Sequence, residues 1–157
     1  MNRRHFIAAA ASGFAMAASA FADGSTTIPF ETFKPYFVLN TIKPEKGKTS
    51  KFGVCTTMEQ FESLFHPAAV MFFSRKQKFV AQDYFNDHVI LYWVEWGNTP
   101  WQYTVQSVEQ SDSGLLVKYS RQGEPSETAY FAPILLVGVK KTALSADGNV
   151  AFQLKGK

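Results

Sequence analysis

The residues HVILYWVEW, His88–Trp96, carry the strongest fold signal in the chain, because most of them are β-branched or aromatic. Such residues favour strands, and a strand that is apolar on both faces has to be covered on both sides. We therefore expect a central strand here. The turn residues Gly97–Pro100 follow, and residues 101–106 then alternate between apolar and polar, which predicts a half-buried strand. We expect these two neighbouring strands to pair as a hairpin.

Strands and turns fill most of the remaining chain. Val108 is out of phase with Val105, which predicts a β-bulge near Ser107. The turn signal Ser111–Gly114 then predicts a second hairpin, with its return strand over residues 115–121. Further strands are expected in four regions, residues 36–42, 52–55, 128–140 and 150–154.

One short helix interrupts the strands. Thr56 is a suitable N-cap and Glu59 follows at the spacing of a capping box, while Pro67 ends the helix near Phe65. Its apolar residues fall on one face, so the helix should lie on a sheet. The predicted fold class is α+β: mostly antiparallel β-sheet, meander or sandwich-like, with one short amphipathic helix near residues 57–65.

Length and composition agree with one folded domain. The chain has 157 residues, of which 46% are hydrophobic and 15% aromatic. A chain of this size and composition buries enough apolar area to offset the entropy cost of ordering it, which excludes intrinsic disorder as the main state. We expect residues 23–35 to form an extended arm and residues 36–157 to form a single α+β domain.

Residues 1–22 resemble an export signal. Arg3 and Arg4 precede a mildly apolar, Ala-rich run, and small residues at positions 20 and 22 predict cleavage after Ala22. The arginine pair resembles a twin-arginine export motif, and the general secretory route remains the alternative. The run is too short and too weakly apolar for stable membrane insertion. The expected location is periplasmic or secreted.

Charge gives no support for a nucleic-acid partner. The chain has 16 Lys and Arg against 13 Asp and Glu, and residues 1–22 contain two of the arginines and no acid. After cleavage the balance is 14 against 13, a formal charge of +1. Such a near-neutral chain lacks the electrostatic excess that nucleic-acid binding needs.

The sequence shows no catalytic or metal-binding constellation. Cys55 is the only cysteine and lies in an apolar stretch, which predicts a buried thiol. A role as nucleophile or in an intermolecular disulfide stays open. His66 and His88 have no partner at ligand spacing, so no metal site is expected. Glycine-rich phosphate loops and nucleophile-elbow motifs are absent from the sequence. We expect no cofactor, no catalytic residue and no enzymatic activity.

Aromatic residues around the turn at Gly97–Pro100 are the candidate binding residues. Trp96 and Trp101 would lie close together across the expected hairpin, and Tyr103 follows them. Such residues either pack within the sheet, contact a protein partner or stack on sugar rings. The sequence leaves all three roles open.

Several short motifs resemble the C-terminal domain of the protease-complex subunit PrcB family over roughly residues 55–141. They comprise a D-Y turn before an apolar strand, a G-x-x-P turn, an aromatic-led strand, and a P-x-x-x-V-x-x-x-K pattern, at residues 83–90, 97–100, 103–109 and 133–141. The T-G-G-Y element of the family is missing, because Trp101-Gln102-Tyr103 follows the turn proline. The resemblance implies a secreted, non-catalytic module that assists a protease complex.

The sequence therefore predicts an exported, non-catalytic protein-binding module, with a secreted protease as a possible partner class. An envelope carbohydrate-binding module that uses the same aromatic residues is the second hypothesis. A small hydrolase that uses Cys55 or a histidine is the third.

Overall fold

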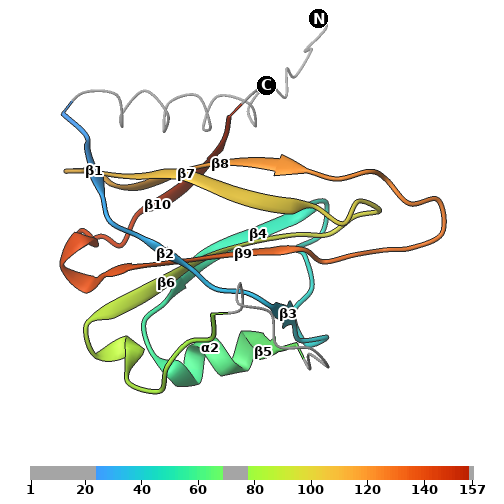
Figure 1. Ribbon diagram of the computed structural model, residues 1–157, viewed down its shortest axis with the longest axis horizontal. Helices are drawn as coiled ribbons and strands as arrows, with labels where there is room; N and C mark the ends of the chain where they lie inside the picture. Colours follow the sequence, from blue (N-terminus) through green and yellow to red (C-terminus); the bar gives the residue numbers. More distant parts are fainter. Residues whose placement is uncertain (1–23, 69–77, 156–157) are drawn as a thin grey trace, which may run out of the picture.

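Two four-stranded sheets face each other and form the centre of the molecule (Figure 1). The computed structural model describes residues 24–68 and 78–155. The outer sheet has the strand order β1-β7-β8-β10. Its strands are β1 (Thr26–Ile28), β7 (Gln102–Ser111), β8 (Gly114–Gln122) and β10 (Val150–Leu154).

The central sheet lies below the outer sheet in Figure 1 and has the order β2-β9-β6-β4. Its strands are β2 (Glu31–Thr32), β9 (Ile134–Lys140), β6 (His88–Glu95) and β4 (Ser50–Cys55). A third layer covers its other face (Figure 1). That layer contains α2 (Met58–Leu64), the 3-10 turn η1 (Tyr84–Asn86), and the strand pair β3 (Tyr36–Val38) and β5 (Phe65–Pro67). A second 3-10 turn, η2 (Lys141–Ala143), follows β9.

The predicted fold class is confirmed. All strand pairs are antiparallel except β8 and β10, which run parallel. The parallel pair arises because η2 and the turn before Val150 return the chain to the outer sheet in the direction of β8. The arrangement is thus a two-sheet sandwich with a helical layer on one side.

Strand β6 is buried on both faces, as its sequence predicts. Val89 and Leu91 pack into the core between the two sheets, whereas Ile90 and Val94 pack into a second core beneath α2. Neighbouring residues of a strand point to opposite faces, so a continuous apolar run fits only a strand with a core on each side.

The hairpin expected between residues 88–96 and 101–110 is wrong. β6 pairs with β4 and β9 in the central sheet, while β7 pairs with β8 and β1 in the outer sheet. Residues 96–101 carry the chain from one sheet to the other, and Thr99 is buried along this path. The second expected hairpin is present, and the register of β7 on β8 shifts between Val105 and Ser107, as predicted for a bulge.

The helix begins one residue later than predicted. Thr57 is the N-cap, and its hydroxyl oxygen accepts a hydrogen bond from the Gln60 backbone N–H. The Gln60 side-chain oxygen in turn accepts from the backbone N–H and hydroxyl of Thr56. Gln60 therefore takes the place expected for Glu59 in the capping box. The helix buries Phe61 and ends where β5 begins at Phe65, as expected.

Within the expected arm, residues 24–35 are described, and they contribute a short strand to each sheet. β1 pairs with β7, β2 pairs with β9, and Phe33 is buried. Between β1 and β2 the chain crosses from the outer to the central sheet, and Ile28 and Phe30 pack against the core between them. We call this side of the sandwich the closed edge. Strands β4 and β10 border the opposite side, which we call the open edge.

Across residues 24–68 and 78–155, no helix has the length and the apolar character that crossing a bilayer requires. The expected export signal, with Arg3, Arg4 and the cleavage site at Ala22, lies outside the described residues.

Candidate functional site

The three aromatic residues predicted for binding do not form an exposed group. Trp96 is 8% exposed and belongs to the core beneath α2, whereas Tyr103 is 4% exposed and belongs to the core between the sheets. Trp101 is partly buried and packs against that same core. Trp96 and Tyr103 are therefore core residues, each in a different core of the sandwich.

A polar network joins two of these residues to a half-buried ion pair. Arg121 Nη1 donates to both carboxylate oxygens of Glu95, at 2.5 and 2.6 Å. The Tyr103 hydroxyl donates to Glu95 at 3.2 Å, and the Arg121 guanidinium lies 4.2 Å from the centre of the Trp101 ring. Glu95 comes from β6 and Arg121 from β8, so the network ties the two sheets together.

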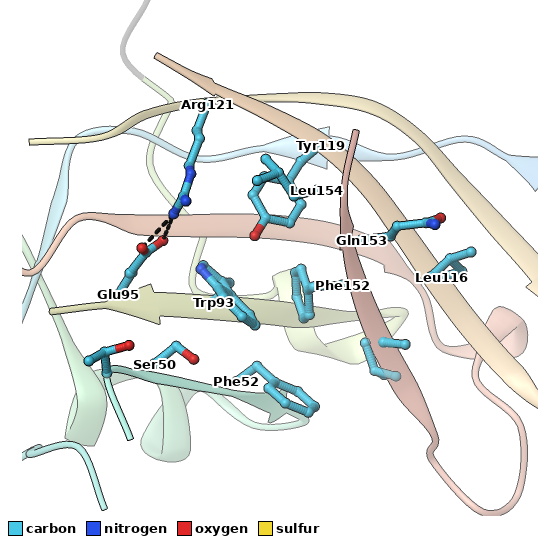
Figure 2. Close-up of a pocket in the computed structure, with 13 residues that line it drawn as sticks. Ser50, Phe52, Trp93, Glu95, Leu116, Tyr119, Arg121, Phe152, Gln153 and Leu154 are labelled. Carbon is cyan, nitrogen blue, oxygen red and sulfur yellow. Dashed lines mark hydrogen bonds and ion pairs between the residues drawn. The ribbon is translucent and has the colours of Figure 1, made fainter. Parts of the chain in front are cut away.

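A cleft of about 640 Å³ lies between the sheets at the open edge, and the ion pair forms one end of it (Figure 2). We call it the edge cleft. Its walls come from β4 and β6 on one side and from β8 and β10 on the other. The residues that line it include Phe52, Trp93, Glu95, Arg121, Phe152 and Leu154.

Aromatic rings form the floor of the edge cleft. Phe52 stacks on Trp93 with ring centres 5.9 Å apart and an angle of 17° between the planes. Phe152 contacts both rings, at 5.9 Å from Phe52 and 5.6 Å from Trp93. Tyr119 packs against Trp93 and Phe152 from the β8 side. Such clusters present a large, rigid apolar surface at little conformational cost.

Two polar groups lie in this aromatic region, the Tyr119 hydroxyl and the Trp93 indole N–H. Burial raises the pKa of the Tyr119 hydroxyl to about 12, with the nearby Glu95 carboxylate acting in the same direction. The Trp93 indole N–H is buried and has no hydrogen-bond partner among the described residues. Figure 2 shows the indole nitrogen on the side of the ring that faces the space between the sheets. A buried donor without a partner favours occupation by an acceptor.

A second, more polar groove of about 870 Å³ adjoins the edge cleft and shares Arg121 and Leu154 with it. It runs over β7 and β8 beside Trp101. Its wall consists mainly of polar side chains, among them Gln102, Thr104, Gln106, Ser120 and Gln122.

Cys55 is a buried thiol, as its apolar surroundings predict. It is fully buried in the core beneath α2, and this burial raises its pKa to about 12. A thiol with so high a pKa holds little thiolate at neutral pH, and the thiolate is the nucleophile. Among residues 24–68 and 78–155 no three His, Cys, Asp or Glu side chains gather in a way that would hold a metal ion.

Comparison of the chain with protein-family models, with curated proteins and with solved structures finds no match in any of the three. The resemblance to the PrcB family therefore stays a prediction. The site has to be interpreted from its own geometry.

The sequence did not single out the residues of the edge cleft. Phe52 and Phe152 are 100 positions apart, and only the stacking of the two sheets brings them together. The sequence predicted a strand over residues 52–55, but β4 is recognised as an edge strand only once the sheets are assembled.

Proposed function

We propose that this chain is an exported, non-catalytic module that binds another protein through the edge cleft. The observation that carries the proposal is the aromatic floor left uncovered at the open edge. Phe52 is 46% exposed and Leu154 is 42% exposed at the rim of the cleft. The ring of Phe52 contacts Trp93 and Phe152, so it extends the core between the sheets outward into solvent.

Aromatic residues and arginine dominate the binding energy of protein interfaces, particularly in pockets that exclude water. Phe52 and Trp93 supply the aromatic surface, and Arg121 lies at the end of the same cleft. Because Glu95 already holds Arg121 in place, the polar end is ordered before any partner arrives. Preorganisation of this kind lowers the entropy cost of association.

A secreted protease is the partner class to test first, because the resemblance to the PrcB family implies one. Export supports the same choice, since the proposed signal over residues 1–22 would deliver the chain to the compartment of secreted proteases. N-terminal sequencing of the exported protein tests this step and should begin at Asp23. Replacement of Arg3 and Arg4 by lysine should abolish export by the twin-arginine route and leave the general secretory route working.

Two exposed phenylalanines provide a matched test of binding. Phe52 lies in the edge cleft, whereas Phe37 is 48% exposed in β3, in the layer beyond the central sheet. We expect the protein and its Phe37→Ser variant to retain the same periplasmic or secreted proteins in affinity capture, and Phe52→Ser to lose them. The retained candidate is then purified and titrated by calorimetry. Equal affinity for both serine variants would contradict the proposal.

Carbohydrate binding is the second candidate, and the polar groove beside Trp101 favours it. Amide and hydroxyl side chains beside an indole ring suit the hydroxyl groups and flat faces of sugars. Arg121 covers one face of Trp101, so that face is not free to stack on a sugar. A glycan array probed with the protein separates the two candidates. Binding that is lost on Gln122→Ala and kept on Phe52→Ser would favour the groove, and silence across the array would count against it.

A further inference from the structure

The free edge of β10 forms part of the wall of the edge cleft. All five residues of the strand, Val150–Leu154, line the cleft. The side chains of a strand point alternately to its two faces, so one face contributes only every second residue. A cleft that touches five consecutive residues therefore runs along the backbone edge of the strand. Strand β4 differs, because the cleft touches Ser50 and Phe52 and leaves out Lys51 and Gly53 between them.

The hydrogen bonds to β8 show which backbone groups of β10 are free. Asn149 O accepts from the Leu115 N–H at 2.9 Å, and the Lys155 N–H donates to Tyr119 O at 2.8 Å. Backbone groups of successive residues point to opposite sides of a strand, so Ala151 and Gln153 also face β8. The N–H and C=O groups of Val150, Phe152 and Leu154 face the other way. No strand among the described residues lies on that side of β10.

We propose that the partner presents an extended segment, which pairs with β10 as a fifth strand of the outer sheet. This inference rests on the function proposed above and specifies how the partner is recognised. Free N–H and C=O groups along an edge are a template for another strand, and main-chain hydrogen bonds then supply affinity. The side chains of the added strand alternate, so every second one faces the central sheet and covers the exposed ring of Phe52.

The chemistry of the edge cleft defines the segment further. Side chains that face Phe52 have to be apolar, because the floor there is aromatic. Lys155 directly follows β10 and forms no salt bridge within the part of the chain that the structure describes. An acidic residue beside Lys155 therefore complements the edge. The expected ligand is a short, extended segment with alternating apolar residues and an acidic residue at one end.

A second copy of this chain fits the edge less well than such a segment. Five residues of β10 span only about 17 Å at the usual rise of a strand. Obligate homodimers bury roughly 2,000 Å² or more, which an edge of this length does not supply by itself.

The test uses a phage-displayed library of random twelve-residue peptides, selected on the protein and followed by fluorescence polarisation with individual peptides. Leu154→Pro removes a backbone N–H that faces the free side and leaves the bonds to β8 intact. Leu154→Ala is the matched control, because it removes the side chain and keeps that N–H. We expect Leu154→Pro to bind selected peptides at least tenfold more weakly than Leu154→Ala. Thermal melting checks that both variants fold.

A second measurement does not depend on any variant of the protein. Each residue of a selected peptide is N-methylated in turn, which removes one donor at a time. Pairing with β10 predicts an alternating pattern, with at least tenfold losses at every second position within the paired stretch. Phe52→Ser should weaken all selected peptides, and Phe37→Ser should leave them unchanged.

The outcomes separate this inference from the proposed function. Peptides that need Phe52 but tolerate Leu154→Pro and every N-methylation would overturn strand addition and leave protein binding standing. Failure to select any peptide that depends on Phe52, together with equal capture of proteins by the two serine variants, would overturn both. A dimer in sedimentation that Leu154→Pro dissociates would assign the edge to a second copy and contradict the inference.

Discussion

The closed edge and the open edge of the sandwich differ in how completely they cover the core between the two sheets. At the closed edge the chain crosses between the sheets, and Ile28 and Phe30 pack against the core. At the open edge β4 and β10 belong to distant parts of the chain, and Phe52 and Leu154 stay exposed. The same core between the sheets is therefore sealed on one side and accessible on the other.

The strands at the open edge are also longer than those at the closed edge. β1 and β2 have three and two residues, whereas β4 and β10 have six and five. Very short edge strands offer little template for another chain, and longer apolar edges are sites of association. We therefore expect the open edge, rather than the closed edge, to bind a partner.

The largest expected effect is on stability at the closed edge. Phe30→Ala removes a partly buried ring from the core between the sheets, and we expect it to lower the free energy of unfolding by about 2 kcal/mol. Phe52→Ala at the open edge should cost less than about 1 kcal/mol, because its ring is already half in water. Urea denaturation of both variants measures the difference. Equal losses would show that the two edges do not differ as described.

Breaking the ion pair at the end of the edge cleft should give the next largest loss in the free energy of unfolding. Arg121→Leu leaves the mostly buried Glu95 carboxylate without its cation, and we expect a loss of about 1 kcal/mol in the free energy of unfolding. Glu95→Gln in the same background should recover part of this loss, since no uncompensated charge then remains. A double-mutant cycle measures the coupling. If the two losses in unfolding free energy simply add, the ion pair contributes no coupling energy to the stability of the fold.

Ionisation of Tyr119 should lower the stability of the folded protein only at alkaline pH. Its pKa is raised to about 12 in the folded protein, above the ordinary value for tyrosine. Folding therefore favours the neutral hydroxyl, and the stability that it contributes is present below about pH 10 and lost as the pH rises toward 12. Tyr119→Phe should make the alkaline decline in melting temperature shallower. A decline identical to that of the unsubstituted protein would contradict the assigned burial.

The sequence predicted the elements better than their pairing. Periodicity identified β6, the bulge in β7 and the helix that ends at Phe65, because these features depend on neighbouring residues. The hairpin between β6 and β7 was wrong because closeness in sequence favoured it, whereas the two-faced burial of β6 required strands on both sides within another sheet.

The site was harder to predict for the same reason. Trp96 and Tyr103 were chosen as aromatic residues near a turn, and the crossing of the chain between the sheets buries both. The residues of the edge cleft come from four strands between β4 and β10, so only the stacking of the sheets reveals them. A local pattern records that a side chain is apolar, and the tertiary fold decides whether that side chain is covered.

Amide hydrogen exchange along β10, followed by NMR with and without a selected peptide, shows whether an added strand pairs with the free edge of β10. In the protein alone, the amides of Ala151, Gln153 and Lys155 should exchange slowly, and those of Phe152 and Leu154 should exchange fast. The peptide should slow Phe152 and Leu154 by at least tenfold and leave the amides of β1 unchanged. Uniform protection along β10 before the peptide is added, or no change on binding, would contradict the account.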